Sequence, residues 1–261
     1  MATHHYKLGR LRRAYDPRVP HLSALLAGTT PAPLPPSKDW TTGMPTSLGM
    51  MLNDTQGDCT CAAFYHALQV WTFNTSTMDT EPDQDVEQLY IQACGYNPAV
   101  PGEGPGGNEQ HVLRYLMRTG APTGPSGDTR HKITAYAEVD PRNTDDVKRT
   151  ILQCGVAYIG FNVPQYILPP PPAEPPAIWD VESANATIAG GHAVVLAGYT
   201  DQGARLISWG QFYTMTWSFF AKYVDEVYAI TDPDWVASKG TTPGGLSLIN
   251  LEAQMKALKE G

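Results

Sequence analysis

The sequence predicts an α+β fold, with helices dominating the first half of the chain and strands the second. Between residues 59 and 118, apolar residues recur at spacings of three and four, which is the helical period. From about residue 132 onward, apolar residues alternate with polar ones or form short β-rich runs, which is typical of strands. Helices and strands do not alternate one by one, so the pattern argues against a parallel sheet built from βαβ units.

Residues 1–40 show neither period and are predicted to form an extended arm that leads into or wraps the domain. The stretch PAPLPPS at 31–37 favours stiff polyproline II structure. The first 20 residues carry a net charge of +4 and the whole chain carries −8, which leaves −12 for the remainder. A basic arm on an acidic body suggests docking on another protein or on an acidic surface; a solvated tail is the alternative.

Three helices are predicted in the first half. The first starts at the sequence GDC and ends near residue 74, with alanine, leucine, valine and tryptophan at helical spacings. The second covers 84–94, with acidic residues in its first turn and Gly95 directly after it. The third covers 108–118 and stops at Gly120.

The second half combines one more helix with several strands. The helix covers 143–155, where Asn143 or Thr144 is the expected cap. The expected strands are 132–139, 156–163, 191–200 and 204–210, with a turn at 201–203, and a further strand after a short helix within 217–231.

Two remaining segments have unusual compositions. The sequence ILPPPPAEPPAIW at 167–179 has too many prolines for a helix or a central strand, so an exposed or groove-lining loop is expected. The last fifteen residues, which include LEAQMKAL, are expected to form a terminal helix.

Composition narrows the class of protein. The net charge of −8 argues against nucleic acid as the main partner. The first residues lack a signal-peptide core, and no window approaches the ~18 apolar residues of a membrane span. Four cysteines in 261 residues do not make a disulfide scaffold. We expect a protein without signal peptide or membrane span, located in a reducing compartment such as the cytoplasm.

Cys59 and Cys61 open the first predicted helix, where free N–H groups and the helix dipole favour a thiolate. A cysteine nucleophile also needs a histidine, and His192 is the best candidate because it opens an apolar strand that would not otherwise favour a polar residue. Cys94 and Cys154 lack the paired spacing of a metal site, so no metal or other cofactor is expected. The alternative is a set of small buried thiols without chemistry.

Five segments form an ordered set along the chain: QGDCTCAAF (56–64), GPGGNEQHVLRYLMRTG (104–120), NTDDVKRTILQCGVAYIGF (143–161), GGHAVVLAGYT (190–200) and ISWG (207–210). Their order and approximate spacing resemble those of the papain-like cysteine peptidases. The resemblance covers roughly residues 43–232. It implies a papain-like fold with a helical left half and an antiparallel β-sheet or barrel right half. The implied organisation is an arm (1–40), a papain-like domain (41–235) and a C-terminal extension with a short helix (236–261).

The resemblance leaves two registers for the nucleophile. In the favoured one, Cys59 is the nucleophile and Asn53, six residues earlier, is the oxyanion donor, with Asp58 completing the Asp-Cys pair found in bacteriocin-processing peptidases. In the other, Cys61 is the nucleophile and Gln56 the donor, with one residue deleted. Only the first keeps the family's six-residue spacing between amide and thiol.

In both registers, the resemblance makes His192 the catalytic base. The position of the family's histidine-orienting asparagine is Ile207, whose side chain cannot accept an imidazole N–H. Its place is then taken by Ser208, by Gln211, by a backbone carbonyl or by no group at all. The substrate-binding residues implied by the resemblance are Gly106, Gly107, Gly191 and Trp209, the last of which shields the histidine.

The function expected from these residues is a thiol hydrolase that cleaves a peptide or amide bond, slowed by the missing asparagine. The alternative is an inactive papain-fold structural or binding protein, for example a phage virion or assembly component that docks through its arm. The chain also resembles papain-like proteins of bacteria and their phages, which makes a virion location the alternative to the cytoplasm. A third interpretation makes residues 1–40 an inhibitory pro-segment, although they lack the expected helical periodicity.

Overall fold

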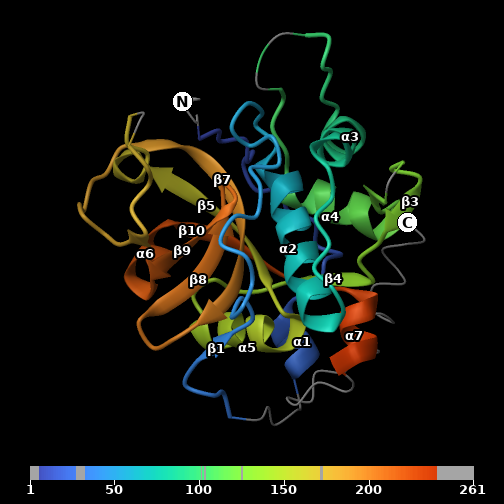
Figure 1. Ribbon diagram of the computed structural model, residues 1–261. Coiled ribbons are helices and arrows are strands. Elements are labelled where there is room, and N and C mark those ends of the chain that lie inside the picture. The colour runs from blue at the N-terminus through green and yellow to red at the C-terminus, as the bar shows by residue number, and fades with distance from the viewer. Residues whose placement is uncertain are drawn as a thin grey trace.

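The computed structural model describes residues 6–27, 33–100, 102, 104–124, 126–170 and 173–239, so the expected terminal helix lies outside the described residues. Helix α2 (Cys59–Thr75) runs between a curved sheet and the helices α3 (Asp83–Cys94) and α4 (Glu109–Arg118) (Figure 1). Every residue of α2 from Cys59 to Trp71 is buried, because sheet and helices cover all of its faces. The first turn of this central helix carries both candidate nucleophiles.

The main sheet has the strand order β4-β10-β5-β7-β8-β9-β6, and β1 pairs separately with β7. Neighbouring strands in this sheet are antiparallel, except for β6 and β9, which are parallel. The bounds are β1 Lys38–Asp39, β4 Ala135–Glu138, β5 Ala157–Pro164, β6 Ile178–Trp179, β7 Ile188–Tyr199, β8 Gly203–Ser208, β9 Gln211–Thr216 and β10 Val224–Thr231. Two further strands, β2 (Ala121–Thr123) and β3 (Thr129–His131), form a separate hairpin.

The remaining helices cover the sheet and close the domain. They are α1 Leu22–Leu26, α5 Thr144–Cys154, the 3₁₀ turn η1 Gln165–Ile167, α6 Trp217–Tyr223 and α7 Pro233–Lys239. Asn143 caps α5 by accepting from the Asp146 N–H, as its sequence predicts. The expected boundary at 235/236 falls inside α7, where Trp235 is buried. None of the described helices is long and apolar enough to cross a membrane.

The α+β prediction is confirmed, and the helices predicted at 84–94, 108–118 and 143–155 lie within a residue or two of α3, α4 and α5. The strand predicted at 132–139 is wrong in extent. The ladder with β10 covers only Ala135 to Glu138, because residues 132–134 connect it to β3, which pairs with β2. The elements α1, α7, η1, β1, β2, β3 and β9 were not predicted. Among its described residues, the proline-rich segment 167–179 contributes the end of η1 and the edge strand β6, which agrees with the exclusion of a central strand.

Candidate active site

The two candidate nucleophiles lie in different surroundings. Cys59 is the first residue of α2, and its sulfur accepts hydrogen bonds from the backbone N–H groups of Ala193 and Gly9. Ala193 directly follows His192, so Cys59 lies against β7 beside the candidate base. The Cys61 sulfur is fully buried and hydrogen-bonds Cys94 of α3 instead.

His192 is held by two neighbours from the turn after β8. Its Nε2 lies 2.8 Å from Ser208 Oγ, and its ring stacks on Trp209 with a centroid distance of 4.5 Å and an interplanar angle of 15°. Its Nδ1 is buried without a hydrogen-bond partner among the described residues. Ser208, and not the fully buried Ile207, is therefore the neighbouring side chain that can hydrogen-bond the His192 ring. When Nε2–H donates to Ser208, Nδ1 keeps the lone pair that a general base needs.

The backbone of this turn is strained. Trp209 has φ of 47°, a left-handed conformation that is uncommon for a bulky residue, and Gly210 follows with φ of 70°. Such outliers persist where the surrounding structure fixes them, and they cluster at functional sites. Here the strained residue is the one that carries the ring stacked on His192.

The candidate oxyanion donors are both engaged. Asn53 Nδ2 donates to Gln56 O and to Asp58 Oδ1, each at 3.1 Å. Gln56 Nε2 donates to Glu87 Oε1 of α3 at 2.9 Å, away from β7. Of the two amides, Asn53 is therefore tied to Asp58, the residue directly before Cys59. The N–H of Cys59 belongs to the first helical turn, where N–H groups have no partner within the helix.

The protonation states match a closed site. Burial raises the pKa of Cys59 to about 12 and lowers the pKa of His192 to about 3. Burial also raises the pKa of Asp58 well above its usual range. At neutral pH the thiol and the imidazole are both uncharged, so the reactive thiolate–imidazolium pair is not formed in this state.

The arm is what closes the site. Its backbone forms hydrogen bonds with both sides of the cleft: the Arg10 N–H donates to Gly191 O at 3.1 Å, and the Leu11 N–H donates to Gly107 O at 2.8 Å. In return, the Gly107 N–H donates to Gly9 O at 2.8 Å. Residues 9–11 thus lie between two of the expected binding glycines, directly over Cys59.

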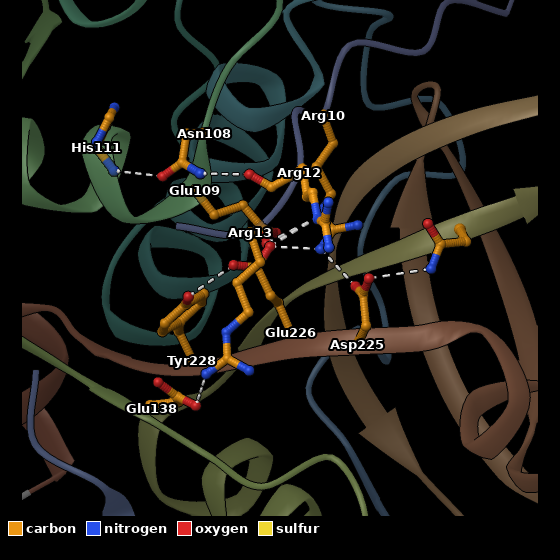
Figure 2. A network of polar contacts seen from close by, with 11 residues as sticks. Arg10, Arg12, Arg13, Asn108, Glu109, His111, Glu138, Asp225, Glu226 and Tyr228 are labelled. Atoms are coloured by element: carbon orange, nitrogen blue, oxygen red, sulfur yellow. Dashed lines mark hydrogen bonds and ion pairs between the residues drawn. The ribbon is translucent and has the colours of Figure 1, made fainter. Parts of the chain in front are cut away.

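The arm continues across the cleft on both sides of this point. At one end, Tyr6 packs edge-on against Trp209 and its hydroxyl donates to Glu174 of the proline-rich segment. At the other end, Asn108 donates to Arg12 O at 3.0 Å, and Arg13 pairs with Glu138 of β4 (Figure 2). Residues 6–13 therefore fill the cleft from the tryptophan to the start of α4.

Charged residues of the arm form ion pairs with the domain. Arg10 and Arg13 pair with acidic residues of the domain, and Arg114 of α4 pairs with Asp16. The interpretation of a solvated tail is therefore wrong for the described part of the arm, where Val19 and Leu22 are also buried. The described part of the basic arm thus docks on acidic residues of the chain's own domain.

Sequence reasoning missed the residues that receive the arm. Neither Gly9 and Arg10 of the arm nor Glu109 and Glu226, which contact Arg10, were predicted as functional residues. A glycine inside an otherwise bulky, basic stretch was the available signal. Of the other histidines, His66 is buried in α2 and His111 of α4 is exposed. The described residues contain no cluster of three histidine, cysteine or acidic side chains suited to a metal ion.

In comparisons of sequence, no family model and no curated protein matches the chain. Solved structures do match. Xylellain, a cysteine protease from Xylella fastidiosa, has a TM-score of 0.66 and 17% identity over 89% of this chain and 98% of its own. ProCathepsin B S9 from Trypanosoma congolense has a TM-score of 0.56 and 11% identity over 87% of each chain. Digestive procathepsin L 3 of Tenebrio molitor has a TM-score of 0.57 and 11% identity over 87% and 76%. The element order, the site geometry and these likenesses together give the chain the fold of the papain-like cysteine proteases.

Proposed function

We propose that this chain is a thiol hydrolase that cleaves a peptide or amide bond and that residues 6–13 keep it inactive in the state described. One observation carries the proposal. The thiol of Cys59 opens a buried helix and is hydrogen-bonded to the residue after His192, whose ring is fixed by Ser208 and Trp209. The papain-like fold supports the same chemistry.

In the proposed reaction, His192 takes the proton of Cys59 and the sulfur attacks the substrate carbonyl carbon. The Cys59 N–H and the Asn53 side chain stabilise the oxyanion, for which Asn53 exchanges one of its present hydrogen bonds. His192 then gives the proton to the leaving amine, and water hydrolyses the thioester and restores the thiol. Ser208 holds the imidazole in the tautomer that these steps require.

Inhibition by the arm follows from what it presents to the sulfur. Gly9 directs an N–H toward Cys59 and its carbonyl toward Gly107, so no carbonyl carbon of this residue faces the nucleophile. The arm also excludes water, which keeps thiol and imidazole neutral. Two proteins of similar fold, a procathepsin B and a procathepsin L, are named as proenzymes.

A second candidate function is binding or assembly without catalysis. The neutral thiol and the filled cleft favour it, as does Ile207 at the orienting position. In this interpretation the arm would leave its own cleft only to contact another protein. The two candidates differ in whether Cys59 becomes reactive once the arm is displaced.

A peptidyl epoxide probe tests the proposal in the full chain and in its Gly9→Ala variant, with the labelled residue identified by mass spectrometry. We expect labelling of Cys59 in Gly9→Ala at a rate at least about tenfold above that of the unchanged chain. Cys59→Ala should remove the label and Cys61→Ala should retain it. Iodoacetamide on denatured protein controls for the presence of free thiols.

The catalytic proposal fails if Gly9→Ala displaces the arm, as judged by protease sensitivity of residues 6–13, and Cys59 still resists the probe. That outcome favours the binding function. Labelling at Cys61 alone would support hydrolase chemistry in the other register.

A further inference from the structure

The side chain of Arg10 lies in an acidic pocket beside the cleft (Figure 2). Its Nε donates to Glu226 Oε2 at 3.0 Å and to Glu109 Oε2 at 3.3 Å. Its Nη2 donates to Glu226 Oε2 and to Asp225 Oδ1, each at 2.5 Å. The side chains of Glu109 and Glu226 are fully buried, and Asp225 is 44% exposed. One guanidinium is thus surrounded by three carboxylates, one of them at the rim.

The pocket is shaped for a guanidinium by a missing side chain. A Cβ at Gly160 of β5 would lie 2.1 Å from Arg10 Nε and 2.4 Å from Glu109 Oε2. Any larger residue would fill the space between the carboxylates. Glu109 opens α4 and Glu226 lies near the start of β10, so helix and sheet each supply one buried acid.

The buried acids need a cation. Burial by itself disfavours the charge of Arg10, yet the carboxylates, Glu109 first, raise its pKa above the ordinary value. Burial raises the pKa of Glu109 well above its usual range, and its Oε1 has no hydrogen-bond partner among the described residues. The second oxygen of Glu226 accepts from the Tyr228 hydroxyl at 3.0 Å. Glu109 can offset the loss of the cation by staying protonated, but Glu226 and Asp225 then lose the guanidinium donor that they share, which is unfavourable. The pocket therefore favours a replacement cation whenever the arm leaves.

The pocket lies one residue from the reactive sulfur along the cleft. Gly9 contacts the sulfur of Cys59 through its N–H, and Arg10 is the next residue. A peptide running in the opposite direction exchanges the positions of N–H and C=O groups, so it brings a carbonyl where the arm has the Gly9 N–H. In such a peptide, the residue whose carbonyl faces the sulfur takes the place of Gly9, and the residue before it takes the place of Arg10. The backbone groups of Gly107 and Gly191 that bind the arm are equally available to a peptide that runs in the opposite direction.

We propose that the pocket formed by Glu109, Glu226 and Asp225 receives an arginine side chain of the substrate, at the second residue before the bond that is cleaved. The inference rests on the proposed function and deepens it by naming a substrate class. Arg10 occupies the pocket in the closed state as a mimic of that side chain.

An arginine suits the pocket better than a lysine. Nε and Nη2 of Arg10 both donate to Glu226 Oε2, while Nε also reaches Glu109 and Nη2 also reaches Asp225. This fork of planar donors is a property of the guanidinium, whereas an ammonium is a single point charge. Citrulline has the same shape without the charge and is the matched neutral control.

Binding can be measured without catalysis. The probe is a fluorescein-labelled peptide, Ala-Ala-Arg-Gly-Ala-Ala, together with versions that carry citrulline or lysine in place of arginine. The protein is the full chain with Cys59→Ala, Gly9→Ala and Arg10→Ala, and the readout is fluorescence anisotropy. We expect the arginine peptide to bind at least about 30-fold more tightly than the citrulline peptide, with lysine between them.

Substitutions of the pocket's acidic residues test whether they cause the preference for arginine. Glu226→Gln should remove most of the preference for arginine over citrulline, and Asp225→Asn, at the exposed rim, should reduce it in part. Asp201→Asn, an exposed change in the turn before β8, is the charge-matched control and should leave it unchanged. If Arg10→Ala prevents folding, the same binding measurement is made on the Cys59→Ala, Gly9→Ala chain. Its preference for arginine over citrulline should be smaller, because its own Arg10 competes with the peptide for the pocket. Equal affinity for arginine and citrulline peptides in the folded protein overturns the proposal.

Hydrolysis separates this inference from the function on which it rests. With Cys59 restored, peptidyl coumarin amides with arginine or citrulline at the second residue before the bond should differ in kcat/KM by on the order of 100-fold. Hydrolysis of both at equal rates would leave the hydrolase standing and remove the arginine pocket. A binding preference for arginine without any hydrolysis would remove the hydrolase and leave the pocket.

Discussion

Gly9 of the arm packs so tightly against Gly57 that a Cβ on Gly9 would lie 1.8 Å from the Gly57 carbonyl oxygen. Real Cβ atoms do not approach backbone oxygens this closely, and neither residue has a flexible side chain that could move away. The arm can therefore pass over Cys59 only with a glycine at this position. The contact fixes where the arm crosses the site.

Gly9→Ala is predicted to displace the arm from the centre of the cleft while leaving the domain folded. The added methyl group cannot be accommodated, and the arm's remaining anchors lie on either side of the crossing point. Limited proteolysis should cleave within residues 6–13 faster than in the unchanged chain. Tyr15→Ala, which alters an arm side chain that is 71% exposed, is the control and should not change the rate. Unchanged protection in Gly9→Ala would show that the arm tolerates the methyl group.

Acid is predicted to open the cleft through His192. Burial holds its pKa near 3 in the closed state, and in an open, solvated cleft it returns towards the ordinary 6.5. The closed state therefore binds the proton less well. The contribution of His192 to the stability of the closed state is complete above pH 6.5 and declines as the pH falls from 6.5 towards 3. For one proton, the ratio of closed to open protein falls by at most about tenfold per pH unit.

Hydrogen exchange of residues 6–13 at pH 7, 5.5 and 4, corrected for intrinsic rates, measures this opening. His192→Phe retains a ring against Trp209 but cannot titrate, so its exchange should lose the part of the pH dependence due to His192. If both proteins open identically as the pH falls, other groups, such as the carboxylates around Arg10, control the arm.

Ser208→Ala is predicted to lower kcat about 10- to 100-fold in the Gly9→Ala chain, with little change in KM. Ser208 Oγ is the partner of His192 Nε2 at 2.8 Å, and losing an orienting partner disturbs tautomer and ring position rather than substrate binding. Kinetics on a peptide amide measure the split between kcat and KM. Ser218→Ala, an exposed change on α6, is the matched control. An unchanged kcat would mean that the stacked Trp209 alone orients the imidazole.

Much of the scaffold could be predicted because it follows local rules. Asn108 and Asn143 each accept from an N–H three residues later, and Gly95 ends α3 in the left-handed conformation, so the helix ends were readable from sequence. The missed elements are short. The two residues of β1, for example, form a strand only because β7 is available as a partner.

An extended arm was predicted, but its path over Cys59 and the pocket for Arg10 could not be, because they depend on contacts between distant segments. Arg10 meets Glu109 and Glu226 at separations of 99 and 216 residues. Its partners are ordinary acidic residues in a helix and a strand. The positive φ of Trp209 is likewise invisible in the sequence ISWG, since it arises from packing around the turn. Local patterns thus indicated the candidate catalytic residues but not what covers them.

The two candidate oxyanion donors can be separated by matched substitutions in the Gly9→Ala chain. Asn53 donates to Asp58, next to Cys59, whereas Gln56 donates to Glu87 of α3. Asn53→Ala is predicted to lower kcat on the order of 100-fold with little change in KM, because an oxyanion donor acts mainly in the transition state. Gln56→Ala should stay within about threefold, because its amide is committed to α3. Thermal unfolding of both variants controls for lost stability, since Asn53→Ala also leaves Asp58 Oδ1 without its donor. The reverse order of effects would move the nucleophile to Cys61.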